Sequence, residues 1–207
     1  MLNIVGTPWR GSLRATINNA RTSYDWVTRL FDLCKIALPQ EAAFTLAIDT
    51  PLGFPDAFMA LANGLKHVDS IGDSSTNPYL YRHTERALFN GKKGPLSAIK
   101  DMIGSQATKG MHVLAKFAPQ IKRCGVWSDG GALTVIETYP AAACRRDTPD
   151  REAIDALPVL AHTDLNDARI CALVAHLFAT HQDAFLQPPA DVPIREGWIW
   201  VPKQGAM

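Results

Sequence analysis

The stretch FTLAIDTPLGFP, residues 44–55, decides the fold, because an apolar run ends abruptly in an acid that is followed by Pro, Gly and Pro. Continuous apolar runs are typical of strands that are buried on both faces. In an open α/β sheet the ligand crevice lies beyond the carboxyl ends of the parallel strands. Residues 44–49 are therefore predicted to form a buried strand that delivers Asp49 to a functional position. The alternative is that Asp49 only accepts backbone hydrogen bonds in the turn.

A second stretch, ALTVIETYP at residues 132–140, repeats this pattern, because a β-branched run again ends in an acid and a proline. Helices are predicted on either side of these strands. One has apolar residues spaced by three and four between residues 26 and 37, and another runs to about His181. Helices that alternate with buried strands favour an α/β fold.

The helix that runs to His181 begins with an acid on its inward face. Asp167 lies three and four residues ahead of Ile170 and Cys171, and these positions share one side of a helix. If the two strands are parallel neighbours and this helix begins above their ends, Asp167 meets Asp49 and Glu137. Clustered carboxylates repel one another unless cations neutralise them, and such oxygen ligands suit Mg²⁺ or Mn²⁺.

Each of the last two acids also has an alternative role. With Asp164 as the N-cap, Asp167 becomes the third residue of its helix and complements the helix dipole. Glu137 would instead pair with a nearby arginine, Arg145 or Arg146.

Composition bounds the function classes. The chain has 207 residues, of which 47% are hydrophobic and 20% charged, an ordinary globular balance. We predict a single domain over residues 1–207 that begins with an irregular lead-in at residues 1–20. No apolar run reaches the length of a membrane span, no secretory signal is present, and the four cysteines lack metal or disulfide spacing. These features favour a cytoplasmic protein without a membrane partner.

The net charge of +1 hides a basic middle segment, residues 82–123, which we interpret as a basic helical insertion. Its excess of Lys and Arg is either a solvated helical face or a surface that attracts the phosphates of nucleic acid.

Four motifs resemble a known family. They are IDTPLG at residues 48–53, ETYP at 137–140, the pattern HxxxxDAxxCAxxA at 162–175 and EGWIWVP at 196–202. In this order they resemble the family called domain of unknown function 429, a set of predicted nucleases with a ribonuclease-H-like fold. The resemblance covers roughly residues 44–202, and YRHTE at 81–85 also resembles a feature of some members.

The resemblance implies a mixed sheet flanked by helices and a metal-dependent site. Asp49, Glu137 and Asp167 would be metal ligands for hydrolysis of phosphodiester bonds by a two-metal mechanism. The family fold normally begins with a strand that carries a Gly-x-Asp acid and is followed by two antiparallel strands. No residue before Asp49 supplies this acid, so the chain is expected to lack part of the N-terminal strand meander.

Three further residues are candidates for substrate binding: Arg82, His83 and His162. The alternative for Arg82 and His83 is a cluster at a helix start that pairs with Glu85. A metal-dependent nuclease is the first functional expectation. The second is a non-catalytic module that binds nucleic acid or a protein partner, which the missing first acid favours. A third is an enzyme that acts on a small phosphorylated or acylated molecule, because one fold hosts several chemistries.

Overall fold

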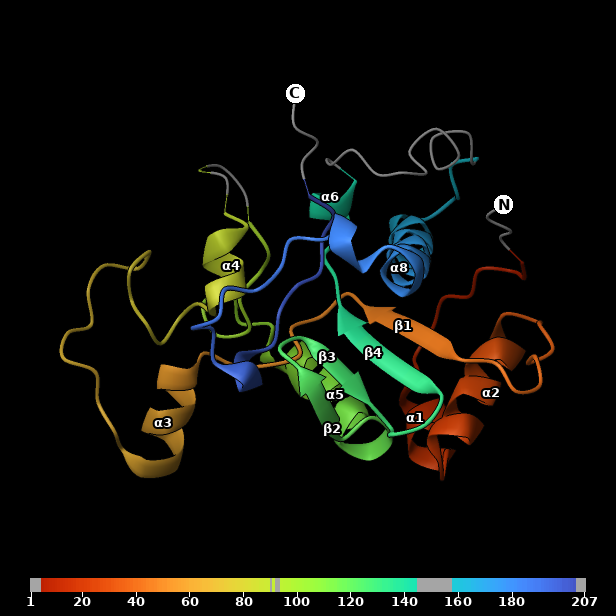
Figure 1. Cartoon of the computed structure of the whole chain (residues 1–207), viewed down its shortest axis with the longest axis horizontal. Helices are drawn as coiled ribbons and strands as arrows, with labels where there is room; N and C mark the ends of the chain where they lie inside the picture. Colours follow the sequence, from red (N-terminus) through yellow and green to blue (C-terminus); the bar gives the residue numbers. More distant parts are fainter. Residues whose placement is uncertain (1–4, 90, 92–93, 145–157, 204–207) are drawn as a thin grey trace.

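A four-stranded mixed sheet forms the centre of the molecule (Figure 1). The computed structural model describes residues 5–89, 91, 94–144 and 158–203. The strand order is β1-β4-β3-β2, with β1 (Phe44–Ile48) parallel to β4 (Leu133–Glu137). The strands β3 (Val126–Ser128) and β2 (Gln120–Arg123) continue the sheet in antiparallel fashion. The predicted mixed sheet flanked by helices is confirmed.

Helices cover both faces of this sheet, because alternate residues of each strand point to opposite sides. Ala47 and Ile136 belong to a core cluster with residues of α8 (Thr163–Thr180). Leu46 and Val135 belong to a second cluster on the other face. That second face packs against α1 (Arg14–Asn19), α2 (Ser23–Leu33) and α5 (Gly104–Phe117).

The helices with an apolar stripe form at the predicted places, but α2 ends at Leu33, before the predicted stripe ends at Ala37. The side chain of Thr22 accepts a hydrogen bond from the Asp25 N–H and caps α2. The sequence also predicts a short helix from Ala57 to Leu65, and this helix is α3 (Asp56–Gly64). The long helix that ends near His181 is α8.

Several short elements were not predicted. The lead-in contains α1, the YRHTE region contains α4 (His83–Ala87), and residues 120–128 form β2 and β3. The short helix α6 (Pro140–Ala143) follows β4 directly, with proline in its first turn. These elements are three to six residues long and have no periodic apolar signal of their own.

Two predicted elements are wrong. The sequence predicts a helix that Ser97 caps and that runs through Ile103, followed by a second helical stretch past Gly104 and Gly110; instead residues 98–101 form a turn, and α5 begins at Gly104 and runs through Gly110. A Cβ at Gly110 would lie 2.6 Å from Thr50 Cγ2, so this glycine serves close packing on the turn after β1. The run EGWIWVP at residues 196–202 also predicts a final strand, but in the structure it makes single pairings of Ile199 with Glu137 and of Pro202 with Phe185.

Local geometry explains the missing final strand. Residues Ile194–Glu196 form the 3-10 helix η2, and Gly197 has a φ of 74°. This left-handed conformation interrupts an extended chain and is favourable for glycine. A second 3-10 helix, η1 (Gln182–Ala184), follows α8.

The position of the antiparallel strands bears on the expected N-terminal meander. Within the described residues no strand precedes β1, and the meander instead runs from β2 through β3 to β4. The end of the predicted basic insertion, β2, is therefore an edge strand of the sheet. Lys92 and Lys93 of that segment lie outside the described residues. No helix in the described part of the chain combines the length and apolarity that a membrane span requires.

Candidate functional site

Two acids end neighbouring parallel strands, as the sequence predicts. Ile48 of β1 pairs with Glu137 of β4, and the Thr138 N–H donates to the Ile48 carbonyl over 3.0 Å. Asp49 therefore follows β1 at the level at which β4 ends. This is the carboxyl edge of the parallel pair, where α/β sheets place their ligand sites.

The alternation of side chains separates these two acids. Asp49 is two residues beyond Ala47, whose side chain packs in the cluster with α8. Glu137 is two residues beyond Val135, which packs in the cluster with α5. Since strand side chains repeat every second residue, Asp49 lies on the α8 face and Glu137 on the opposite face.

Asp49 and Asp167 lie together at the junction of β1 and α8. Burial, then the charge of Asp167 and then that of Glu137 raise the pKa of Asp49 to about 6. Burial raises the pKa of the Cys171 thiol, and the charges of Asp49 and Asp167 raise it further. Burial and the charge of Asp164 raise the pKa of Asp167 as well. The charge of Asp167 acts on Asp49 and the charges of both act on Cys171, so the two carboxylates lie near one another beside this cysteine.

Among the described residues, neither carboxylate of this pair has a cationic partner. Across the described residues, the Asp49 and Asp167 side chains make no ion pair or hydrogen bond. Asp49 nevertheless keeps solvent access, so surrounding protein removes only part of its hydration. The neighbouring Thr50 Oγ1 is buried without a partner among described atoms. A partly dehydrated, unpaired carboxylate pair favours a cation.

Glu137 has the opposite environment, because a buried arginine neutralises it. Arg82 Nη2 donates to Glu137 Oε1 over 2.6 Å, and Arg82 Nη1 donates to Oε2 over 2.8 Å. The Leu52 N–H also donates to Oε2 over 2.9 Å. The described contacts favour the ion-pair interpretation of Glu137, although its partner is Arg82. Arg145 and Arg146 lie outside the described residues.

Arg82 is fully enclosed by its partners. Its side chain is 0% exposed, and its Nε donates to Glu85 Oε1 over 2.8 Å. Burial opposes its charge, but Glu137 and then Glu85 raise the pKa of Arg82 above its usual range. The Arg82 N–H donates to Glu85 Oε2, which fixes the start of α4. This geometry favours the helix-start interpretation of Arg82 over phosphate binding from solvent.

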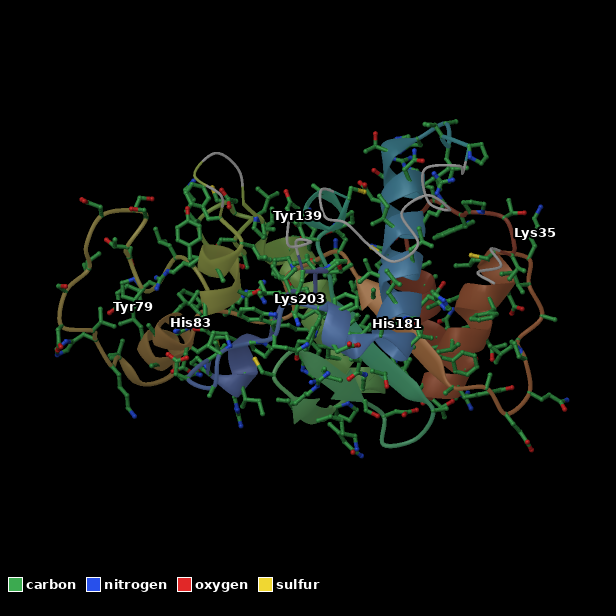
Figure 2. All side chains as sticks on the ribbon, turned by 45° about the horizontal axis from the view of Figure 1, so that its top comes forward. Lys35, Tyr79, His83, Tyr139, His181 and Lys203 are labelled. Carbon is green, nitrogen blue, oxygen red and sulfur yellow. The ribbon has the colours of Figure 1, made fainter. Side chains whose placement is uncertain are left out.

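His83 joins a neighbouring acid that the sequence did not single out, Glu196. His83 Nδ1 lies 2.9 Å from Glu196 Oε2, and the His83 N–H donates to the same oxygen over 2.9 Å. The Asp56 N–H donates to Glu196 Oε1 over 2.7 Å. Figure 2 shows His83 on the side of α3 and α4, away from His181 at the end of α8. No local sequence signal connects Glu196 with residues so far apart in the chain.

His162 caps α8, and this corrects the predicted cap at Asp164. The Nδ1 atom of His162 accepts a hydrogen bond from the Asp164 N–H over 3.1 Å. Asp164 instead pairs with Arg10 Nε over 2.7 Å at the surface. Asp167 is consequently the fifth residue of the helix rather than the third. His162 retains an exposed ring beside the start of α8.

The donor set at Asp49 and Asp167 fits a hard cation, because carboxylate oxygens are the ligands that Mg²⁺ and Mn²⁺ prefer. Within the described ranges, no three or more His, Cys, Asp or Glu residues form a group that could hold a metal ion. Two protein carboxylates are nevertheless a common complement for Mg²⁺, which keeps several waters.

A cavity of about 440 Å³ lies beside this region, between α3, α5 and η2. Its wall includes Leu52, the residue whose N–H is bound to Glu137. None of the three predicted metal ligands lines it.

Comparison with known proteins adds no family assignment, since no protein-family model, no curated protein and no solved structure matches this chain. The resemblance to domain of unknown function 429 therefore stays a prediction, and the function has to be argued from the site.

Proposed function

We propose that this protein is a metal-dependent nuclease that hydrolyses phosphodiester bonds, with Asp49 and Asp167 as the acids that hold Mg²⁺ or Mn²⁺. One observation carries the proposal. Asp49 ends a parallel strand at the carboxyl edge of the sheet without a cationic partner among the described residues, and α8 brings Asp167 beside it.

The chemistry of this proposal divides between the ion and the protein. A bound divalent ion would activate a water and stabilise the leaving oxygen. Asp49 and Asp167 would orient that ion from a strand end and a helix, two rigid elements. The raised pKa of Asp49 supports this role, because burial and the charges of Asp167 and Glu137 disfavour its ionised form and a bound cation would offset these effects.

Glu137 would contribute to a second ion only in part. Its Oε2 already accepts two hydrogen bonds, whereas Oε1 accepts one from Arg82. A carboxylate oxygen has two lone-pair sites, so Oε1 keeps one acceptor position. A second ion bound at this position would lie on the face opposite Asp49, so the two-metal form of the proposal would need ions on both sides of the strand ends, with Arg82 holding the Glu137 carboxylate in place.

The phosphate-binding roles are redistributed within the proposal. His162 is the N-cap of α8, the helix that carries Asp167. His83 has an exposed ring at α4. In the basic segment, Lys116 donates to backbone carbonyls of Ile17 and Asn18, and Arg123 donates to Gln182. These internal contacts leave fewer cations for nucleic acid than the count of basic residues suggests. A cytoplasmic location agrees with the unbridged thiols of Cys34, Cys124 and Cys171.

A second candidate function has its own observation. Because Arg82 neutralises Glu137, two unpaired acids remain in the described part of the site instead of three. This favours a non-catalytic module that binds nucleic acid or a protein partner, and it agrees with the missing first-strand acid.

The two candidates separate in a cleavage assay with Mn²⁺ or Mg²⁺ and labelled single-stranded, duplex and hybrid substrates. Asp49→Asn and Asp167→Asn should each reduce cleavage by more than about 10-fold to 100-fold, the loss that even outer residues of metal sites produce. Asp69→Asn, an exposed acid in the loop after α3, is the matched control. Cleavage that is unchanged in Asp49→Asn overturns the proposal, and binding without metal-dependent cleavage supports the second candidate.

A further inference from the structure

The cavity between α3, α5 and η2 has an apolar floor that no described residue fills. Phe54, Met59 and Met111 line it, and each of these side chains is at least partly exposed. Its volume of about 440 Å³ lies within the range of small-molecule sites, about 300 to 1,000 Å³. Hereafter we call it the α3 pocket.

Two exposed basic side chains, for which the described residues supply no partner, line the α3 pocket. Lys66 and Arg195 both line the α3 pocket and are exposed. Among the described residues, neither side chain makes an ion pair or hydrogen bond. Asp56 is the one acid in the wall, so the formal charge of the lining is +1. The polar part of the α3 pocket therefore favours an anion.

The floor suits a flat aromatic group. The Phe54 ring lies 5.6 Å from the Phe58 ring, and this pair turns Phe54 into a supported platform. Thioethers such as those of Met59 and Met111 make favourable contacts with aromatic rings. Any of the nucleic-acid bases can stack on such a ring, because every base has a π-face.

The wall of the α3 pocket is tied to the strand ends. The Leu52 N–H donates to Glu137 Oε2 over 2.9 Å, and a Cβ on Gly53 would lie 2.4 Å from the Glu196 carbonyl oxygen. Backbone packing of this closeness holds the wall rigidly. Leu52 is also three residues beyond Asp49, so one extended ligand can reach both the wall and the carboxyl edge of β1.

We propose that the α3 pocket binds one nucleotide of a single-stranded nucleic acid, with its base on Phe54 and its phosphate at Lys66 and Arg195. The inference rests on the proposed nuclease function, and it names the substrate class as single-stranded, because a base can enter the pocket only when it is unstacked and unpaired.

Binding is measured with the full chain in EDTA, by fluorescence anisotropy of a short labelled oligonucleotide, as a single strand and as a duplex. The single strand should bind more tightly than the duplex. Phe54→Leu, which keeps the site apolar but removes the ring, should raise the Kd of the single strand about fivefold or more. Lys66→Glu and Arg195→Ala should weaken binding similarly and make its salt dependence shallower.

Matched controls exist for each variant. Tyr24→Leu removes an exposed aromatic ring on α2, which does not line the α3 pocket. Arg14→Glu reverses an exposed charge on α1, which lies far from α3 in Figure 1. Both controls should change the Kd by less than about twofold, and an unchanged unfolding midpoint shows that each variant folds.

The outcomes distinguish this inference from the function on which it rests. If cleavage requires Asp49 but substitutions at Phe54 and Lys66 do not change single-strand binding, the proposed role of the α3 pocket is wrong and the nuclease proposal stands. If single-strand binding depends on these residues but no metal-dependent cleavage is detected, the nuclease proposal is wrong and the proposed role of the α3 pocket stands. Absence of binding by the unmodified chain, or preference for the duplex, overturns the inference.

Discussion

The ends of β1 and β4 lie side by side, yet they treat their acids in opposite ways. Glu137, at the end of β4, is 2% exposed and is held by two nitrogens of a fully buried Arg82. Asp49, directly after β1, is reachable by solvent and has no cationic partner among described residues. One acid is part of the structure, and the other is available for a ligand.

The difference follows from the period of a strand. Glu137 pairs with Ile48, so Glu137 and Ile48 share a face, and Asp49 is one residue further and points to the other face. An offset of one position between the two strands therefore places neighbouring acids in separate environments. Proximity of strand ends is therefore insufficient evidence for a shared site.

The largest effect is expected at the Glu137 end. Arg82→Ala leaves Glu137 and Glu85 buried without their cation, and breaking a buried pair in this way costs about 3 to 5 kcal/mol. Chemical denaturation measures the loss. Arg86→Ala is the control, because Arg86 lies on α4, is exposed and donates to the Asn77 carbonyl. A loss below about 1 kcal/mol for Arg82→Ala would show that the pair does not hold this strand end.

The packing of the turn between the two strand ends gives the next effect. A Cβ at Gly110 would lie 2.6 Å from Thr50 Cγ2 and 2.7 Å from Leu52 Cδ2. Gly110→Ala should therefore cost about 1 to 3 kcal/mol, despite the better helix propensity of alanine. At Gly104 a Cβ meets only a carbonyl oxygen at 3.9 Å, so Gly104→Ala should not destabilise. Equal unfolding free energies for the two variants would argue against close packing here.

At the Asp49 end, the contribution to the free energy of unfolding is expected to depend on pH. The pKa of Asp49 rises from 3.8 to about 6, so between these values the folded state binds more protons than the unfolded state. The contribution of Asp49 to stability therefore falls as pH rises through this window. In EDTA at pH 7, Asp49→Asn should be more stable than the unmodified chain, and this difference in unfolding free energy should shrink as the pH falls from about 6 to 4. A difference that grows as the pH falls through this window would have the wrong sign.

The smallest effect is expected for an exposed pair at the start of α8. Arg10 and Asp164 are both about half-exposed, and exposed pairs contribute about 0 to 1 kcal/mol. Arg10→Ala should change the free energy of unfolding by no more than this, and added salt should erase the change. A larger loss would mean that the lead-in supports α8 through other contacts.

Local patterns predicted the parts of this site that depend on one element. The apolar runs before Asp49 and Glu137 are strands, and the stripe after Asp167 is a helix on β1. The partner of Glu137 is 55 residues away in the chain, and no local signal connects the two. The face that each acid takes depends on the register of β1 against β4, which a buried run that is apolar on both sides does not reveal.

The most direct test of the contrast between the two strand ends is the titration of Asp49 itself. The side-chain carboxyl carbon of Asp49, assigned by comparison with Asp49→Asn, is followed by nuclear magnetic resonance against pH in EDTA and again with Mg²⁺. We predict a midpoint near pH 6 without metal and a clear decrease when Mg²⁺ is added. A midpoint near pH 3.8 that does not change with Mg²⁺ would contradict the claim that Asp49 is an unpaired carboxylate at a cation site.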